Sequence, residues 1–131
     1  MRRQYHSRNT ERGVLIWDVH RLVELTRGLP VADVSLADIR ELDESFWFDP
    51  DNPTDVPTCR AVAEHAKLMG EVDLNHPIIL SADGRVMDGM HRVCRAWTLG
   101  HATVRAVRFD ADPEPDHVDV ALEDLPYDEP A

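Results

Sequence analysis

Two short apolar runs, PIILS and RVM, stand at residues 77–81 and 85–87 on either side of the tripeptide ADG at residues 82–84. An Asp-Gly pair between apolar runs is a strong short-range signal of a β-hairpin, because both residues accept the backbone angles of a tight turn. The chain then continues into GMHRVCRAWTLG, which predicts a helix ending at Gly100. A hairpin followed at once by a helix favours the α+β class. The helix is expected to stack four side chains on its buried face: Met90, Val93, Cys94 and Trp97.

Two further helices are predicted upstream of this hairpin. The segment WDVHRLVELTRGLP, residues 17–30, carries apolar side chains at the helical period and ends in glycine and proline, which stop a helix. The segment CRAVAEHAKLMG, residues 59–70, follows Thr58, a suitable N-cap residue. Cys59 is expected on the buried face of this helix and His65 on the border of that face.

The segments between these helices predict short strands and a long loop. VADV at residues 31–34 and TVRAVRF at residues 103–109 are rich in β-branched side chains and predict strands. SLADIRELDE, residues 35–44, predicts a short helix capped by its first serine. The three prolines of FWFDPDNPTDVPT, residues 46–58, predict an irregular loop anchored by its aromatic start. The predicted order is helix, strand, helix, hairpin, helix, strand, which is an α+β pattern.

The negative charge of the chain is concentrated at its C-terminal end. Nine of the 25 acidic residues and none of the 14 Lys and Arg residues lie from Asp110 onward, so the part before it is nearly neutral. We therefore expect a single domain over residues 1–109 and an acidic, proline-containing tail over residues 110–131. Such a tail is either a solvated extension or is docked on the body through its apolar side chains. The candidates for docking are Val118, Val120, Leu122, Leu125 and Tyr127.

Charge and apolar length also restrict the expected partners. An acidic tail repels a phosphate backbone and no basic stripe offsets it, which argues against DNA binding. No stretch reaches the roughly 20 apolar residues of a membrane span, and the arginine-rich start lacks a signal-peptide core, so we expect a cytoplasmic protein with no membrane partner. The two cysteines, Cys59 and Cys94, lack the spacing of a metal site or a disulfide framework. The oligomeric state has no signal in the sequence.

The box DGMHR, residues 88–92, places a cation where a helix dipole disfavours one. Gly89 opens the predicted helix, and Arg92 falls in its first turn, near the positive end of the dipole. Free amides at a helix start bind anions, glycine lets a ligand approach the main chain, and the fork of arginine suits phosphate oxygens. Asp88 would then bind magnesium or accept a proton, as carboxylates do in phosphoryl transfer. The alternative is structural, with Asp88 as a cap, His91 as a surface ring and Arg92 as a salt-bridge partner.

The stretch HPIILSADGRVMDGMHRVCRAWTLGHATVRAVRF, residues 76–109, resembles the ParB/sulfiredoxin-like superfamily. The likeness lies in the PIIL strand, the turn, the DGxHR box at a helix start and the closing strand, and it extends more weakly back to Val31. It implies a small mixed sheet with packed helices over residues 1–109. It also implies that the box, Gly89 to Arg92 with Met90 and His91 between them, binds the phosphates of a nucleotide such as ATP, ADP or CTP.

The branches of that superfamily differ in their match to this chain. The partition proteins carry Glu-Arg-Arg after the glycine, of which only Arg92 is present here, and sulfiredoxins need a cysteine where Met90 stands. The free-serine kinases carry Asp-Gly-His-His-Arg, which is similar to this box except at Met90. That resemblance implies that Asp88 assists phosphoryl transfer, with a magnesium ion. A second catalytic acid would come from the segment after the first predicted strand, where the candidates are Glu41, Asp43 and Glu44.

Three further side chains are candidates for the same site. Arg60, near the start of the second predicted helix, is a second phosphate donor or an ordinary partner of Glu64 one turn later. His65 is expected near the pocket, and Trp47 either stacks a base or anchors its loop. Two functions remain open: nucleotide-dependent phosphoryl transfer or hydrolysis on a small molecule, and a non-catalytic ligand-sensing or protein-interaction module.

Overall fold

An N-terminal hairpin begins the fold, and the sequence patterns did not predict it. In the computed structural model, which describes residues 3–127, β1 (Tyr5–Thr10) pairs antiparallel with β2 (Gly13–Asp18). The short tail strand β7 (His117–Val118) pairs with the other edge of β2 and completes a sheet in the order β1-β2-β7. The chain reverses through Glu11 and Arg12, and the next residue, Gly13, has a φ angle of 107° that disfavours any other residue.

A second, mixed sheet contains the predicted hairpin. Its order is β3-β6-β4-β5, formed by β3 (Ala32–Ser35), β6 (Thr103–Arg108), β4 (Ile78–Leu80) and β5 (Val86–Asp88). The pair β4 and β6 is parallel and the other two pairs are antiparallel. The Asp-Gly turn is confirmed, since the amide of Gly84 donates to the carbonyl of Ser81 at 2.9 Å between β4 and β5.

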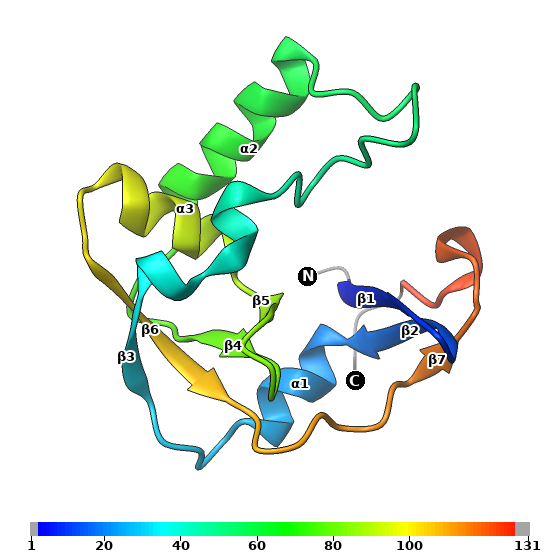
Figure 1. Cartoon of the computed structure of the whole chain (residues 1–131), viewed down its shortest axis with the longest axis horizontal. Helices are drawn as coiled ribbons and strands as arrows, with labels where there is room; N and C mark the ends of the chain where they lie inside the picture. Colours follow the sequence, from blue (N-terminus) through cyan, green and yellow to red (C-terminus); the bar gives the residue numbers. More distant parts are fainter. Residues whose placement is uncertain (1–2, 128–131) are drawn as a thin grey trace.

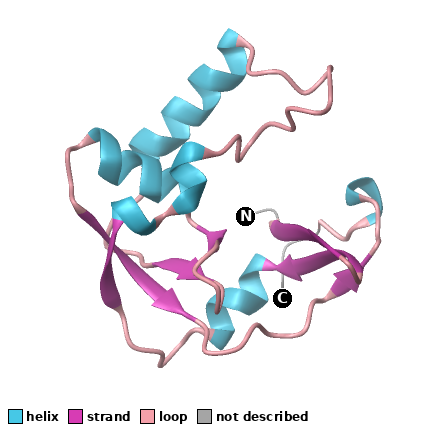
Figure 2. Ribbon diagram, viewed as in Figure 1, coloured by secondary structure: helices cyan, strands magenta, loops and turns pink. Residues whose placement is uncertain are grey.

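Helices cover both faces of this mixed sheet (Figures 1 and 2). The described residues form three α-helices: α1 (Val19–Leu25), α2 (Cys59–Glu71) and α3 (Met90–Thr98). Alternate residues of β4 divide between two apolar clusters, because successive side chains of a strand point to opposite faces. Ile78 and Leu80 pack with the buried side of α3, whereas Ile79 packs with Leu22 of α1. The class is therefore α+β, as predicted.

Two predicted core positions are wrong. Cys59 is exposed, and no residue of α2 is buried, because this helix lies outside α3 and is half-buried on one side only, at Ala61, His65 and Met69. Trp97 is 64% exposed. The buried stripe of α3 advances in steps of three residues through Met90, Val93 and Ala96, so Trp97 lies one residue off it.

Two of the predicted helices have different boundaries in the structure. The first helix is shorter than expected, because the Asp18 side chain accepts from the amide of His20 and starts it, leaving Trp17 in β2. The predicted helix at residues 35–44 is instead two 3-10 turns, Leu36–Asp38 and Arg40–Asp43. Ser35 does cap the first, but extended backbone at the buried Ile39 separates them.

The described part of the acidic tail is docked on the N-terminal hairpin. The indole Nε1 of Trp17 donates to the carbonyl of Pro113 at 2.8 Å, and Arg21 pairs with Asp116 at 3.1 Å. Leu125 is buried, with 4% exposed. Residues 128–131 lie outside the described residues. None of the helices found between residues 3 and 127 is long and apolar enough to cross a membrane.

Candidate functional site

The N-terminus of α3 is open at the backbone. Gly89 is its N-cap residue with φ 107°, and no side chain caps the first-turn amides. A Cβ at Gly89 would lie 2.7 Å from Cγ2 of the buried Ile78, so only glycine fits. Two constraints therefore require glycine at this position: the left-handed backbone and the close approach of Ile78 in β4. The guanidinium of Arg92 also lies beside this position, with Nη2 3.0 Å from where that Cβ would be.

Arg92 is held in place by three acceptors. Its Nη2 donates to Oδ2 of Asp88 at 2.9 Å, and its Nη1 donates to the carbonyls of Pro77 at 3.0 Å and His76 at 3.2 Å. The side chain is 15% exposed. The Asp88–Arg92 salt bridge is the one expected if the box has only a structural role. It fixes the guanidinium at the helix start. Asp88 is correspondingly engaged, which reduces its freedom to act as a base.

A cavity of about 860 Å³ lies in front of this helix start. It is enclosed by α1, the C-terminal end of α2 and the box at residues 88–92. Its lining includes three carboxylates, two guanidinium groups and three imidazoles: Glu71, Asp73 and Asp88; Arg3 and Arg92; His20, His76 and His91. Arg3 also pairs with Asp18. Arg3 and His20 were missed by sequence reasoning, because they come from segments far from the box in the chain and carry no local motif.

His91 belongs to an aromatic stack beside the cavity. The rings of His65 and His91 join through Nδ1 and Nε2 at 2.9 Å, and Trp47 stacks on both, with centroid distances of 4.2 and 4.6 Å. Burial, and then the charge of His65, lower the pKa of His91. His65 therefore contacts His91 of the box but does not line the large cavity, and Trp47 packs the proline-rich loop against both helices.

We expect Trp47→Ala to raise the pKa of His91 toward its ordinary value of 6.5, because the indole shields that ring from water. Histidine ring shifts followed by NMR across the acid range measure the change. Phe46→Ala is the control, since Phe46 contacts Trp47 edge-on and stands 40% exposed. An unmoved His91 titration in Trp47→Ala would contradict shielding by the indole as the cause of the low pKa.

The other predicted acids lie apart from Asp88. Glu41 is buried and its Oε2 accepts from the amide of Val86 at 2.6 Å, while Glu44 pairs with Arg85 at 2.7 Å. The hydrogen bond from Arg85 lowers the pKa of Glu44. Both acids line a second cavity and neither lines the large one.

The remaining candidates also lie outside the large cavity. Asp43 is exposed, and Arg60 is exposed at the start of α2. Among residues 3–127, no three His, Cys, Asp or Glu side chains form a group that could hold a metal ion. A metal held by protein ligands alone therefore has no geometric support in the described chain.

Comparison with known proteins gives no relative for this chain. No protein-family model, curated protein or solved structure matches it. What the arrangement offers chemically is a helix start without a side-chain cap, flanked by imidazoles and carboxylates, at the edge of a cavity of about 860 Å³.

Proposed function

We propose that this chain is a nucleotide-binding domain of the ParB/sulfiredoxin-like type, with the phosphates bound at the N-terminus of α3. The observation that carries the proposal is the uncapped helix start, from Gly89 to Arg92, which opens on a cavity of about 860 Å³. Small-molecule sites occupy roughly 300–1,000 Å³, so the volume suits a nucleotide. The order of hairpin, box, helix and closing strand also agrees with the resemblance of the sequence.

The charge around the cavity favours a nucleotide that brings magnesium. Three carboxylates, Glu71, Asp73 and Asp88, exceed the two guanidinium groups that line it. A bare triphosphate would be repelled by this excess. Mg²⁺ offsets it, and this ion is usually held by one or two carboxylates together with substrate phosphates rather than by a protein cage. We therefore propose ATP, ADP or CTP as the magnesium complex.

Binding is better supported than catalysis. Asp88 is engaged by Arg92, and Glu41 and Glu44 line another cavity, so the predicted pair of catalytic acids is not assembled around the α3 start. This favours a ligand-sensing role over nucleotide-dependent transfer or hydrolysis. The two are separated by incubating the protein with ATP or CTP, magnesium and a panel of small hydroxyl compounds. Formation of a nucleoside diphosphate would support the enzyme.

The proposal is tested by a thermal-shift screen with ATP, ADP, CTP and GTP, with and without magnesium. A ligand at about 100 times its dissociation constant stabilises a fold by about 2.7 kcal/mol, which is a readily measured shift. We expect stabilisation by a magnesium nucleotide. A flat response to all four would remove the basis of the proposal.

Arg92→Ala provides the residue-specific arm of the test. We expect it to weaken nucleotide binding at least tenfold, corresponding to about 1.4 kcal/mol, because it removes the cation at the helix start. Arg95→Ala is the matched control: Arg95 lies on the same helix and donates to two carbonyls, those of Met69 and Gly70, but does not line the cavity. Equal affinities of the two variants would contradict phosphate binding at Arg92.

A further inference from the structure

Three buried side-chain atoms lack a hydrogen-bond partner in the described chain, and all three belong to residues that line one cavity. They are Nε2 of His6, Nη2 of Arg8 and Oε1 of Glu41. The cavity has a volume of about 350 Å³ and lies between the N-terminal hairpin and the turn that joins β4 to β5. It shares no lining residue with the cavity at α3, so a proposal about it does not rest on nucleotide binding.

Glu41 presents an acceptor that the protein leaves unused. The side chain is 4% exposed, and its Oε2 accepts from the amide of Val86. Its Oε1 lies 3.8 Å from Nη1 of Arg85, beyond hydrogen-bond distance, because that nitrogen donates to Glu44 at 2.7 Å. A buried carboxylate oxygen without a donor is costly, so its persistence points to a partner that the chain itself does not supply.

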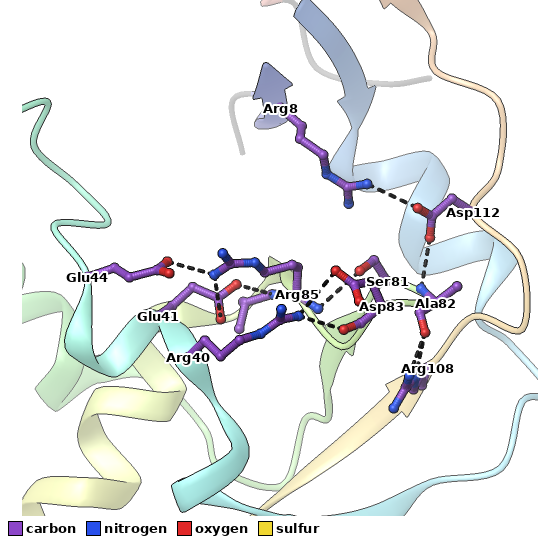
Figure 3. A network of polar contacts seen from close by, with 11 residues as sticks. Arg8, Arg40, Glu41, Glu44, Ser81, Ala82, Asp83, Arg85, Arg108 and Asp112 are labelled. Carbon is purple, nitrogen blue, oxygen red and sulfur yellow. Dashed lines mark hydrogen bonds and ion pairs between the residues drawn. The ribbon is translucent and has the colours of Figure 1, made fainter. Parts of the chain in front are cut away.

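Arg8 presents the complementary donor from β1. Its Nη1 donates to Oδ2 of Asp112 at 3.0 Å, and the guanidinium carbon lies 5.1 Å from the centroid of the Trp17 ring. These contacts fix the group but leave the N–H of Nη2 unsatisfied. Figure 3 shows Arg8 with Asp112, and Glu41, Glu44 and Arg85 beside the Ser81–Asp83 turn.

The charges around this cavity nearly cancel. Arg8 and Arg85 stand against Glu41, Glu44 and Asp83 on its wall, and Arg40 pairs with Asp83. Burial, and then the charge of Arg8, lower the pKa of His6 to about 4, so its ring is neutral near pH 7. A polyanion or a polycation would therefore meet as much repulsion as attraction. The unused groups instead call for one acceptor and one donor on the same small molecule.

We propose that this second cavity binds a small molecule without net charge, whose hydrogen-bond acceptor meets Arg8 and whose N–H donor meets Glu41. Two chemical sources share this pattern, a neutral amide and an amino-acid zwitterion. Nε2 of His6 lies in the same wall, and this ring nitrogen can donate or accept a further hydrogen bond, depending on the tautomer. Ordered water alone is the competing occupant, since water also satisfies buried polar groups.

The experiment is an NMR titration of the full chain that follows the amide of Val86, which Glu41 holds directly. Acetamide and glycine are the two probes that carry both an acceptor and a donor. Acetate and methylammonium are the controls, because each carries one half of the pattern. We expect a saturable shift of Val86 with acetamide or with glycine, and none with either control at the same concentrations.

Variants separate a built site from adventitious binding. Glu41→Gln keeps the size of the side chain and an acceptor for Val86 but turns its NH₂ toward the cavity, and Arg8→Gln removes the cationic donor. We expect each to weaken binding of the active probe at least tenfold. Arg12→Gln is the matched control on the same hairpin, since Arg12 is exposed and pairs loosely with Glu114 at 3.6 Å.

Each outcome bears on the proposal. Saturation by acetamide alone identifies the amide class, and saturation by glycine alone identifies the zwitterion. No saturable shift with either probe, or equal affinities in Arg8→Gln and Arg12→Gln, would overturn the proposal and leave ordered water as the occupant. If Glu41→Gln fails to fold, Arg8→Gln decides the question alone. The folded state of each variant is read from the same spectra.

Discussion

Replacing Gly89 by alanine is expected to lower the free energy of unfolding by roughly 3 kcal/mol, the sum of two separate costs. The backbone at φ 107° lies in the left-handed region, where an L side chain costs about 1–2 kcal/mol. The new methyl carbon would also lie 2.7 Å from Cγ2 and 3.0 Å from Cβ of Ile78. Ile78 is fully buried at the centre of the apolar cluster under α3 and cannot move aside, so overpacking adds about 1–3 kcal/mol.

The control for this prediction is Gly100→Ala at the other end of the same helix. Gly100 also has a positive φ, 78°, but nothing lies within 4 Å of the position its Cβ would take. We expect only the backbone cost of about 1–2 kcal/mol there. Chemical denaturation of the three proteins measures both values. Equal losses at the two positions would show that the contact with Ile78 relaxes, and the close packing of β4 on α3 would then not explain the glycine.

The sequence predicted the segments whose signals are local. The Asp-Gly turn, the β4–β5 hairpin and the helix from Met90 depend on residues within a few positions of one another, and all are present. The pairing of Asp88 with Arg92 is equally local, because residues four apart meet on a helix face. The structural interpretation of the box therefore arose from the same pattern as the functional one, and spacing alone cannot separate the two.

The features that the sequence missed depend on contacts between distant segments. The N-terminal hairpin gains its partners from the tail, and Arg8 and Asp112 meet across 104 positions of the chain. A local window gives no signal of such contacts, because it contains only one of the two segments that meet. The same holds for the exposure of Cys59, which depends on whether another element covers α2 and not on the period of α2 itself.

The two cavities also differ in how far the sequence predicted the residues that line them. The residues of the box were expected to act together, and Asp88, Gly89, His91 and Arg92 do line one cavity. Met90 does not, because its side chain is buried in the apolar cluster under α3. Glu41, Asp43 and Glu44 were candidates for a second catalytic acid beside Asp88, as the resemblance to the free-serine kinases implied. The 3-10 turn instead aims Glu41 at the start of β5, where it accepts from Val86. A break of the helix at Ile39, which no propensity rule predicts, decides where these acids lie.

Acidification is expected to destabilise the fold through His6, and the effect is large. Burial, and then the charge of Arg8, keep the folded ring neutral down to a pKa of about 4, whereas the unfolded ring takes up its proton near 6.5. Between these values the unfolded chain binds more protons, so stability falls as the pH falls. Above about pH 6.5 the ring is neutral in both states, so it no longer makes the free energy of unfolding depend on pH.

The full loss assigned to His6 is about 3 kcal/mol, since each pKa unit corresponds to about 1.4 kcal/mol. Denaturation at about pH 7 and about pH 4 measures it by difference between the parent and His6→Gln, because carboxylates that titrate in the same range affect both proteins alike. His101→Gln, at an exposed position, is the control and should follow the parent. If His6→Gln lost as much stability as the parent on acidification, the neutral ring in the wall of the second cavity would not be the cause.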